Sequence, residues 1–319
     1  MADLAALAGV SKITVSRALG DSNLVNPQTR ARVQQLAREH GYKLNVNARN
    51  LRLRRIHTVA VIVEMKPSAQ RSMSDPYPLM LLGGITQELT AAGYGVLVTT
   101  RQGSTAAAVQ AADGLILLGQ GAHLDAVRRF EKLGLPMVVW GDASAANGPV
   151  TVGSDNRGGA AAVAEHLFSM GRRRPMFIGN PSHPEIFERL HGFVDAFAAR
   201  GVKPLLLRRD AFTPEAGADA VNALHARGVS FDAIFASSDM LAIGAIQATL
   251  ALGLSVPGDV SVVGYDDTPA GASFACPLTT VRQDWKSAGL LLARKILTLM
   301  AGETASSTCL PVELVPRAT

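Results

Sequence analysis

The chain has 319 residues, of which 48% are hydrophobic, 18% charged and 5% aromatic. This length allows two or three domains with well-buried cores, and the apolar content excludes a disordered or fibrous protein. No stretch approaches the roughly 20 consecutive apolar residues of a membrane helix, and no basic segment followed by an apolar one opens the chain. The two cysteines, Cys276 and Cys309, are far apart and predict neither a disulfide framework nor a thiolate metal site. We therefore expect a cytoplasmic protein that has no contact with a membrane.

The charge is distributed unevenly along the chain. Residues 1–57 carry ten Lys or Arg and three Asp or Glu, a net charge of +7, whereas the other 262 residues carry 21 and 23, a net charge of −2. A solvated charged face is one explanation. A whole segment with this bias more often binds a polyanion such as nucleic acid.

The basic segment begins with a pattern typical of a helix-turn-helix. Residues 3–19 predict two short helices separated at Gly9, with Ser11 as the N-cap of the second helix. A third helix is predicted from Asn26-Pro27 to Gly41, since Asn is a good N-cap and Pro fits the first helical position. The second helix then exposes a face that fits a DNA major groove, formed by Lys12, Ile13, Ser16 and Arg17. An ordinary small helical bundle is the alternative.

From residue 58 onward, short apolar runs alternate with helical stretches. The expected strands are residues 59–63, 94–98, 114–118, 137–140, 176–178, 205–207, 233–236 and 260–263. Continuous apolar strands that alternate with helices predict a parallel sheet covered on both faces. Because about 260 residues are many for one sheet, we expect two α/β subdomains, with the break near residues 152–156.

Many motifs of the chain stand in the order of a known family. The segments LAALAGVSKITVSRAL and VNPQTRARVQQLAREHGYKLN, and then SDNRGGAAAVAEHLFSMGRRRPMFIG and FDAIFASSDMLAIGAIQATLALGLSVPGDVSVVGYDDTP, resemble the lactose/galactose repressor (LacI/GalR) family of bacterial transcription regulators. The resemblance covers the whole chain. It implies a small all-α DNA-binding head, a hinge helix, and an α/β core of two parallel-sheet subdomains like those of periplasmic sugar-binding proteins.

The resemblance also implies domain boundaries. We expect a helix-turn-helix domain over residues 1–44, a hinge helix and linker over 45–57, and an effector-binding core over 58–319. Within the core, we expect a first subdomain over about 58–153 and 283–305, and a second over about 154–280 and 306–319. The first helix has no Ser or Thr N-cap ahead of it, whereas the family normally has several more residues there. Either the first few residues are missing or this helix frays.

The family's DNA contacts map onto named residues of the head and hinge. Lys12, Ile13 and Arg17 are implied to contact bases, and phosphate contacts are implied for Ser11, Thr14, Ser16, Asn26, Thr29 and Arg30. Residues 45–51 resemble the hinge helix, in which Ala48 and Leu51 would contact DNA and Leu51 would open a base step from the minor groove. Packing of Leu51 on the core is the alternative. Leu44 and Asn50 replace the proline and serine usual in the family.

Ligands of open parallel sheets bind beyond the carboxyl ends of the strands, and polar residues at these ends are the candidates for effector binding. By resemblance, Arg189 and Asp266 are ligand residues and Phe235 stacks on the ligand. The further candidates from strand ends and nearby loops are Asp75, Tyr77, Gln120, His183, Glu185 and Asp239. For Asp239, a charge that complements a helix dipole is an equally good explanation. Carboxylates, an arginine and an aromatic ring suit a sugar, although a nucleoside or purine uses the same groups.

We therefore expect a homodimeric transcription regulator, most often a repressor in this family, that binds palindromic double-stranded operator DNA under the control of a small sugar. The alternatives are a regulator that responds to a nucleoside, a purine or a phosphoprotein, an extracytoplasmic solute-binding protein, and a sugar-acting enzyme. Phosphate-loop, zinc-protease and serine-hydrolase motifs are absent from the sequence, and the seven histidines show no metal spacing. We expect no catalytic residues, no metal and no cofactor. No heptad run follows residue 311, which favours a dimer over a tetramer.

Overall fold

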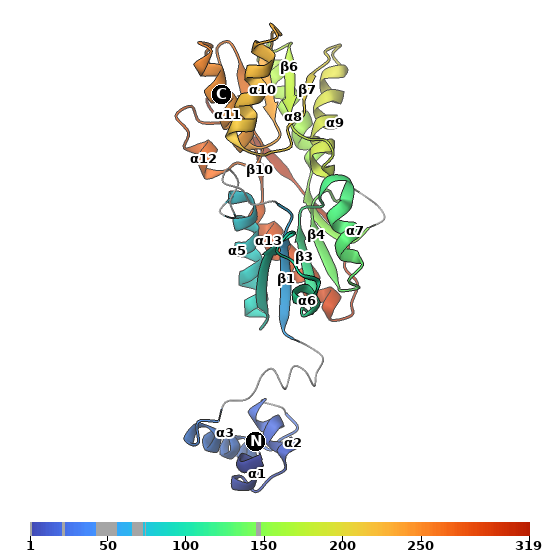
Figure 1. Cartoon of the computed structure of the whole chain (residues 1–319), viewed down its shortest axis with the longest axis vertical. Helices are drawn as coiled ribbons and strands as arrows, with labels where there is room; N and C mark the ends of the chain where they lie inside the picture. Colours follow the sequence, from blue (N-terminus) through green and yellow to red (C-terminus); the bar gives the residue numbers. More distant parts are fainter. Residues whose placement is uncertain (1, 21–22, 43–55, 66–72, 74, 145–147) are drawn as a thin grey trace. The chain divides into compact units, whose positions relative to one another are not determined.

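The computed structural model describes residues 2–20, 23–42, 56–65, 73, 75–144 and 148–319. The chain divides into two compact units, Met1–Ile56 and His57–Thr319. Figure 1 shows the helices of the first unit and the mixed helices and strands of the second.

The described residues of the first unit form the helices α1 (Ala2–Leu7), α2 (Lys12–Leu19) and α3 (Pro27–Glu39). Gly9 has a φ of +60°, which a residue with a Cβ adopts only under strain, and it forms the turn before α2. As predicted, Ser11 caps α2, since its Oγ accepts a hydrogen bond of 3.1 Å from the amide of Thr14. Aliphatic side chains, most of them Ala or Val, form the core of this unit: Leu4, Ala5, Ala8, Val15, Ala18, Val25, Val33 and Ala37.

The second unit contains a six-stranded parallel sheet in the order β11-β5-β4-β3-β1-β2. Its strands are β1 (Thr58–Val63), β2 (Gly95–Thr100), β3 (Gly114–Leu118), β4 (Met137–Trp140), β5 (Val150–Ser154) and β11 (Thr308–Leu310). Because strand residues alternate between the faces, Val59, Val61 and Val63 belong to one core, and Ala60 and Ile62 to another.

Helices cover both faces of this sheet. Helices α5 (Pro76–Ala91) and α13 (Trp285–Met300) pack on one face, and α6 (Ala106–Gln110) and α7 (Asp125–Glu131) on the other. Helices α5 and α13 approach closely because Gly289 lacks a side chain: a Cβ there would lie 2.6 Å from the carbonyl oxygen of Leu81. We call this sheet and its four helices the first subdomain.

The second subdomain is built on a four-stranded parallel sheet in the order β7-β6-β8-β9. Its strands are β6 (Pro175–Ile178), β7 (Leu205–Leu207), β8 (Ala233–Ala236) and β9 (Ser261–Val263). Helices α8 (Asn156–Ser169) and α9 (Pro184–Ala198) cover one face, and α10 (Pro214–His225) and α11 (Asp239–Ala251) cover the other, as Figure 1 shows. Two short helical elements also belong to the second unit: η1 (Ala122–Leu124), which follows β3, and α12 (Pro269–Ala272), which follows β9.

The chain passes between the two subdomains at β5–α8, at β10–α13 and at β11–β12. Strands β10 (Thr280–Gln283) and β12 (Val312–Val315) form an antiparallel pair. Figure 1 shows β10 running from one subdomain toward the other. These connections place the ends of β5 and β10 at the junction where a ligand that touches both subdomains would lie.

The fold class expected from the sequence is confirmed, with corrections in detail. Residues 308–310 were expected in the second subdomain, but they form β11 and pair with β5 of the first sheet. Strands β5, β10 and β12 were not predicted from the sequence either. These three strands and β11 are short and carry Thr, Gly, Arg, Gln, Glu or Cys among their apolar residues, so no continuous apolar run marks them. Within the described part of the chain, no helix is long and apolar enough to span a membrane.

Candidate functional site

One face of α2 is exposed and carries the predicted base-contacting residues. Lys12, Ile13 and Arg17 are exposed, whereas Val15 and Ala18 on the opposite side are buried in the helical core. Ile13 leaves 52% of its surface in solvent, although Val15 in the same helix is fully buried. An exposed isoleucine between two cationic side chains gives this face both apolar and donor groups, which suits the edges of DNA bases.

Most of the predicted phosphate-contacting residues lie at helix starts: Ser11 and Thr14 at the start of α2, and Asn26, Thr29 and Arg30 at the start of α3, whereas Ser16 lies in the middle of α2. The side chains of Ser11 and Asn26 cap α2 and α3, so their oxygens accept from backbone amides of their own helices. Thr29 and Arg30 are partly exposed in the first turn of α3. Ala48 and Leu51 lie outside the described residues, as does most of the predicted hinge.

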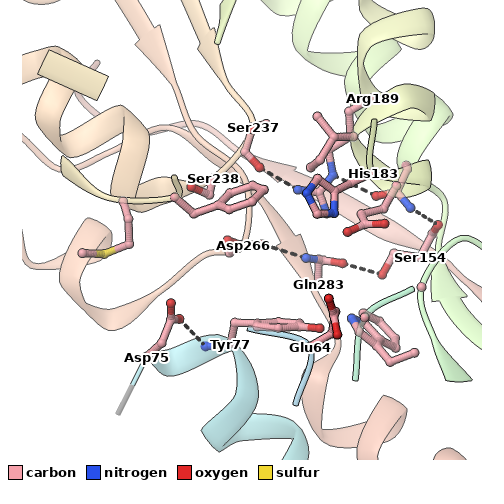
Figure 2. Close-up of a pocket in the computed structure, with 18 of the residues that line it drawn as sticks. Glu64, Asp75, Tyr77, Ser154, His183, Arg189, Ser237, Ser238, Asp266 and Gln283 are labelled. Atoms are coloured by element: carbon pink, nitrogen blue, oxygen red, sulfur yellow. Dashed lines mark hydrogen bonds between the residues drawn. The ribbon is translucent and has the colours of Figure 1, made fainter. Parts of the chain in front are cut away.

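A cleft lies between the two subdomains of the second unit and holds about 880 Å³ of empty space, including its open mouth. Loops at the carboxyl ends of β1, β3 and β4 line it from the first subdomain, and those after β8 and β9 line it from the second. Figure 2 shows polar side chains pointing into this space from both sides. The cleft therefore lies where the parallel sheets of both subdomains end, as the rule for open α/β sheets predicts.

Arg189 of α9 is held firmly in the wall of the second subdomain. Its Nε donates to Asn156 Oδ1 at 2.8 Å, and its Nη1 donates to the carbonyl oxygen of Ser237 at 2.7 Å (Figure 2). Its guanidinium also lies 3.5 Å from the ring centroid of Tyr265. Because packing and hydrogen bonds fix this side chain before any ligand arrives, its charge is preorganised at the cleft.

Asp266 belongs to a chain of hydrogen bonds that follows the junction between the subdomains. Ser154 Oγ donates to Gln283 Oε1 at 2.7 Å, and Gln283 Nε2 donates to Asp266 Oδ1 at 2.8 Å (Figure 2). The backbone of Asp266 has a φ of 126°, which L residues rarely adopt, and Trp285 Nε1 donates to its carbonyl oxygen at 3.1 Å. Burial is the main cause that raises the pKa of this carboxyl well above its usual value, and nearby Arg189 opposes the rise.

An aromatic cluster forms the wall of the first subdomain. The rings of Tyr77 and Trp285 lie 5.4 Å apart edge to face, and those of Trp140 and Trp285 lie 5.6 Å apart. These are the only two tryptophans of the sequence, and both line the cleft. Flat apolar faces of this kind pack well against the C–H faces of a sugar or against a base.

Glu64 follows β1 and lies beside this aromatic cluster in Figure 2. Its Oε1 accepts a hydrogen bond of 2.7 Å from Arg101, which also pairs with Asp125 at 2.7 Å. Its Oε2 is buried and has no hydrogen-bond partner among the described residues. Burial raises the pKa of Glu64, while the bond to Arg101 opposes that rise.

The structure brings six of the predicted ligand residues together in the cleft: Asp75, Tyr77, His183, Glu185, Arg189 and Asp266. Two of them come from the start of α5, where Asp75 caps the helix by accepting from the amide of Tyr77 at 3.0 Å. The other four come from the second subdomain.

Three predicted residues do not line the cleft. Phe235 is fully buried in β8 and packs on Phe177, Phe193 and Tyr265, so the predicted stacking on a ligand is wrong. Both faces of β8 are covered by helices, and only the residues that follow the strand reach the cleft.

Asp239 and Gln120 hold loops in place instead. The carboxylate of Asp239 accepts from the amide of Thr268 at 2.6 Å and from Thr280 Oγ1 at 2.6 Å, so it ties α11 to the loop after β9 and to β10. The amide of Gln120 donates to the carbonyl oxygen of Asp142 and accepts from its backbone N–H, which joins the loops after β3 and β4. Neither side chain lines the cleft, because loop residues next to a strand end bond to each other as readily as to a ligand. Asp239 begins α11, which agrees with the alternative that its charge complements the helix dipole.

The sequence-based prediction also missed much of the wall. The additional lining residues with a polar or aromatic side chain are Glu64, Trp140, Ser154, Asn156, Phe212, Ser237, Ser238, Thr268, Gln283 and Trp285. Several of these residues could have been predicted from the sequence, because they lie at the ends of apolar runs. Glu64 follows one run, Trp140 ends another, and Ser237-Ser238 follow a third. Ser154 and Gln283 had none, because their strands were not predicted. Among the described residues, no group of three or more His, Cys, Asp or Glu could hold a metal ion.

Comparisons with known proteins agree with this architecture. A model described as "Bacterial regulatory proteins, lacI family" matches residues 1–45, and one described as "Periplasmic binding protein-like domain" matches residues 164–319. The HTH-type transcriptional regulator CelR of Thermobifida fusca is 33% identical over 324 residues, which cover 98% of this chain and 94% of CelR. The chain belongs to the LacI family of bacterial regulatory proteins.

Other members of the LacI family match along the whole chain as well. The HTH-type transcriptional repressor CytR of Escherichia coli K12 is 32% identical over 320 residues, covering 96% of this chain and 91% of CytR. A lac repressor dimer bound to operator and the anti-inducer ONPF has a TM-score of 0.83 at 26% identity, covering 99% of this chain and 97% of that one. A CelR–cellobiose complex has a TM-score of 0.72 at 30% identity, covering 99% and 98%. The chain is therefore a regulatory protein rather than an enzyme or a solute-binding protein.

Proposed function

We propose that this LacI-family protein is a homodimeric repressor that binds a palindromic DNA operator and changes its operator affinity when a sugar binds in the cleft. The observation that carries the proposal is the cleft itself. Fixed polar groups on one wall, led by Arg189 and Asp266, face an aromatic wall formed by Tyr77, Trp140 and Trp285. Sugars present hydroxyls around their ring edge and apolar C–H faces, and this pairing of walls complements both.

The DNA-binding part rests on the exposed face of α2 and the net charge of +7 over residues 1–57. Lys12, Ile13 and Arg17 are proposed to contact bases, and Ser11, Thr14, Ser16, Asn26, Thr29 and Arg30 to contact phosphates. Ala48 and Leu51 complete the proposed interface as hinge residues. The lac repressor relative was solved on its operator, which supports the same role here. Since operator DNA lies in the bacterial cytoplasm, we expect the protein to act there.

The dimer is supported by apolar side chains exposed on α5. Leu79 and Met80 leave 48% and 41% of their surfaces in solvent in the first turns of this helix. A partner subunit that covered these two side chains would remove their apolar surface from water. The related lac repressor structure contains a dimer.

A cellobiose complex of the relative CelR favours a sugar over a nucleoside as effector. The test is a selection of binding sites from random duplex DNA by the full chain, followed by operator titrations with and without a panel of sugars. We expect a palindromic site whose affinity shifts with at least one sugar. Selection of no common sequence would refute the DNA-binding proposal, and a shift produced by nucleosides alone would replace the sugar with that class.

A further inference from the structure

The segment η1, which connects β3 to α7 in the first subdomain, is joined to the second subdomain by a backbone hydrogen bond. The amide of His123 donates to the carbonyl oxygen of Ser182, in the loop after β6, at 2.7 Å. Gly121 and His183, which are close to these two residues in the sequence, both line the cleft. The bond therefore lies beside the cleft, and it would break if the two subdomains moved apart there.

The donor side of this bond has a strained backbone. His123 and Leu124 have φ angles of +53° and +62°. In this left-handed region the Cβ of an L residue comes too close to the backbone, and the conformation is unfavourable for side chains such as His and Leu. Two such residues in succession persist only where the surrounding contacts hold them.

Contacts within the first subdomain anchor both ends of η1. The side chain of Leu124 packs against the apolar core between the sheet and α7. Asp125, the first residue of α7, pairs with Arg101 at 2.7 Å. Gly121, on the other side of η1, has a φ of +72°, and a Cβ there would collide with Oδ1 of Asp125. The His123 amide therefore reaches Ser182 from a segment that is fixed before and after it.

The acceptor is held in place by hydrogen bonds within the second subdomain. The amide of Ser182 donates to Asn180 Oδ1 at 2.9 Å, and Arg208 Nη2 donates to Ser182 Oγ at 2.9 Å. Asn180 Nδ2 in turn donates to Asp210 Oδ1 at 2.8 Å. Because the acceptor loop is fixed in this way, the strain of forming the bond to His123 falls on the backbone of η1.

We propose that η1 is a strained latch: the bond from His123 to Ser182 holds the two subdomains in the arrangement seen here, and the left-handed backbone of His123 relaxes when this bond breaks. The strain lowers the population of the latched arrangement. A ligand that contacts both walls of the cleft binds this arrangement, so the strain weakens its binding by the same factor. The link to the effector rests on the proposed function, whereas the latch itself can be tested without a ligand.

Substitutions at His123 can change the strain alone, because its side chain is exposed and makes no buried contact that would be lost. His123→Gly and His123→Asn should relieve the strain, since Gly and Asn adopt left-handed φ angles readily, and the β-branched His123→Val should increase it. The matched control is the same series at His57. This residue also has a φ of +53°, but it precedes β1, at the end of the strand opposite the cleft.

Hydrogen exchange at the amide of residue 123 reports how often the bond opens. It is measured on the full chain without ligand, by mass spectrometry with residue-level fragmentation, and corrected for the intrinsic rate of each side chain. Protection should rise about fivefold in the Gly and Asn variants and fall about fivefold in the Val variant, a change of about 1 kcal/mol in each direction. The His57 series should leave it unchanged. Wild-type protection in all three His123 variants would overturn the proposal, as would the opposite order.

Titrations with a panel of sugars then test the effect on the effector, with fluorescence of the two tryptophans in the cleft as the signal. A sugar that binds the wild type should bind the Gly and Asn variants about fivefold more tightly and the Val variant about fivefold more weakly. Constant sugar affinity, while protection follows the series, would overturn the role of the latch in effector binding. If no sugar binds the wild type, the sugar effector of the proposed function is refuted, and the exchange series alone confirms or overturns the latch.

Discussion

Gln283 donates a hydrogen bond of 2.8 Å from Nε2 to Oδ1 of Asp266. Gln283 ends β10, which leads from the second subdomain to α13 of the first, and it also accepts from Ser154 at the connection between β5 and α8. A ligand that contacts Asp266 therefore touches a hydrogen-bond chain that crosses two of the connections between the subdomains. Ligand binding at Asp266 can therefore change the relative position of the two subdomains through this hydrogen-bond chain.

We predict that Asp266→Asn and Arg189→Ala each abolish the response to the effector and leave operator binding intact. Losing a buried partner leaves ligand hydroxyls unpaired, which weakens binding by about 1–3 kcal/mol. A ligand that no longer prefers one conformation of the core cannot shift DNA affinity. Calorimetry with the bound sugar and operator titrations check both effects. Wild-type sugar affinity in both variants would exclude these residues from the site.

We predict that Phe235→Ala destabilises the fold and leaves ligand affinity of the folded protein unchanged. Phe235 is fully buried among other aromatic rings, and such truncations cost about 3–5 kcal/mol. Phe212→Ala is the matched control, since Phe212 lines the cleft and its removal should weaken sugar binding. Urea unfolding measures the loss of stability, and fluorescence titrations measure the loss of sugar affinity. Phe235→Leu serves where the alanine variant does not fold, and weaker ligand binding at unchanged stability would restore the stacking role.

We predict that Arg17→Ala relaxes base discrimination, whereas Arg30→Ala weakens all DNA sequences alike. Arg17 is exposed on α2, and Arg30 lies in the first turn of α3. Loss of a base contact should cost about 1–3 kcal/mol at one base pair in each half-site, and loss of a phosphate contact should lower the salt slope by about one. Titrations on operator and random duplexes at several salt concentrations test this. Equal losses for both duplexes in both variants would contradict the division into base and phosphate contacts.

We predict a stability difference between the wild type and Asp239→Asn that depends on pH. Burial raises the pKa of Asp239 from 3.8 to about 6, while bonds from Thr280 and Thr268 oppose the rise. A raised pKa in the folded state means that the folded protein binds the proton more tightly. Protonated Asp239 therefore stabilises the fold fully when the pH is below the pKa of this carboxyl in the unfolded chain. This stabilisation is lost as the pH rises through about 6, the pKa in the folded state.

The free energy of unfolding of the wild type should fall relative to Asp239→Asn between about pH 4 and pH 7, by up to about 1.4 kcal/mol per pH unit for one proton. Urea unfolding at intervals across this range gives the measurement. A constant difference between the two proteins would show that Asp239 does not titrate there.

Local sequence patterns were sufficient to predict many of the helices and strands of this molecule. Ser11 and Asn26 could be recognised as helix caps because the hydrogen bond of a cap joins residues two or three positions apart. The continuous apolar strands 59–63 and 114–118 could be recognised because both of their faces are covered by helices. Arg189 and Asp266 followed from motifs that the chain shares with its family.

The tertiary structure decided which of the candidate side chains face the cleft and which further residues join them. Gln283 and Ser154 meet across 129 positions of the sequence, and neither belongs to a strand that shows a distinct apolar run. Phe235, Asp239 and Gln120 have the residue types of a binding site, yet Phe235 points into a core and the other two bond to neighbouring loops. Trp140 and Trp285 form the aromatic wall instead. They lie together because α13, which follows the second sheet in the sequence, packs on the first sheet. The direction of a side chain at a strand end depends on which element packs beside it, and that element comes from a distant part of the chain.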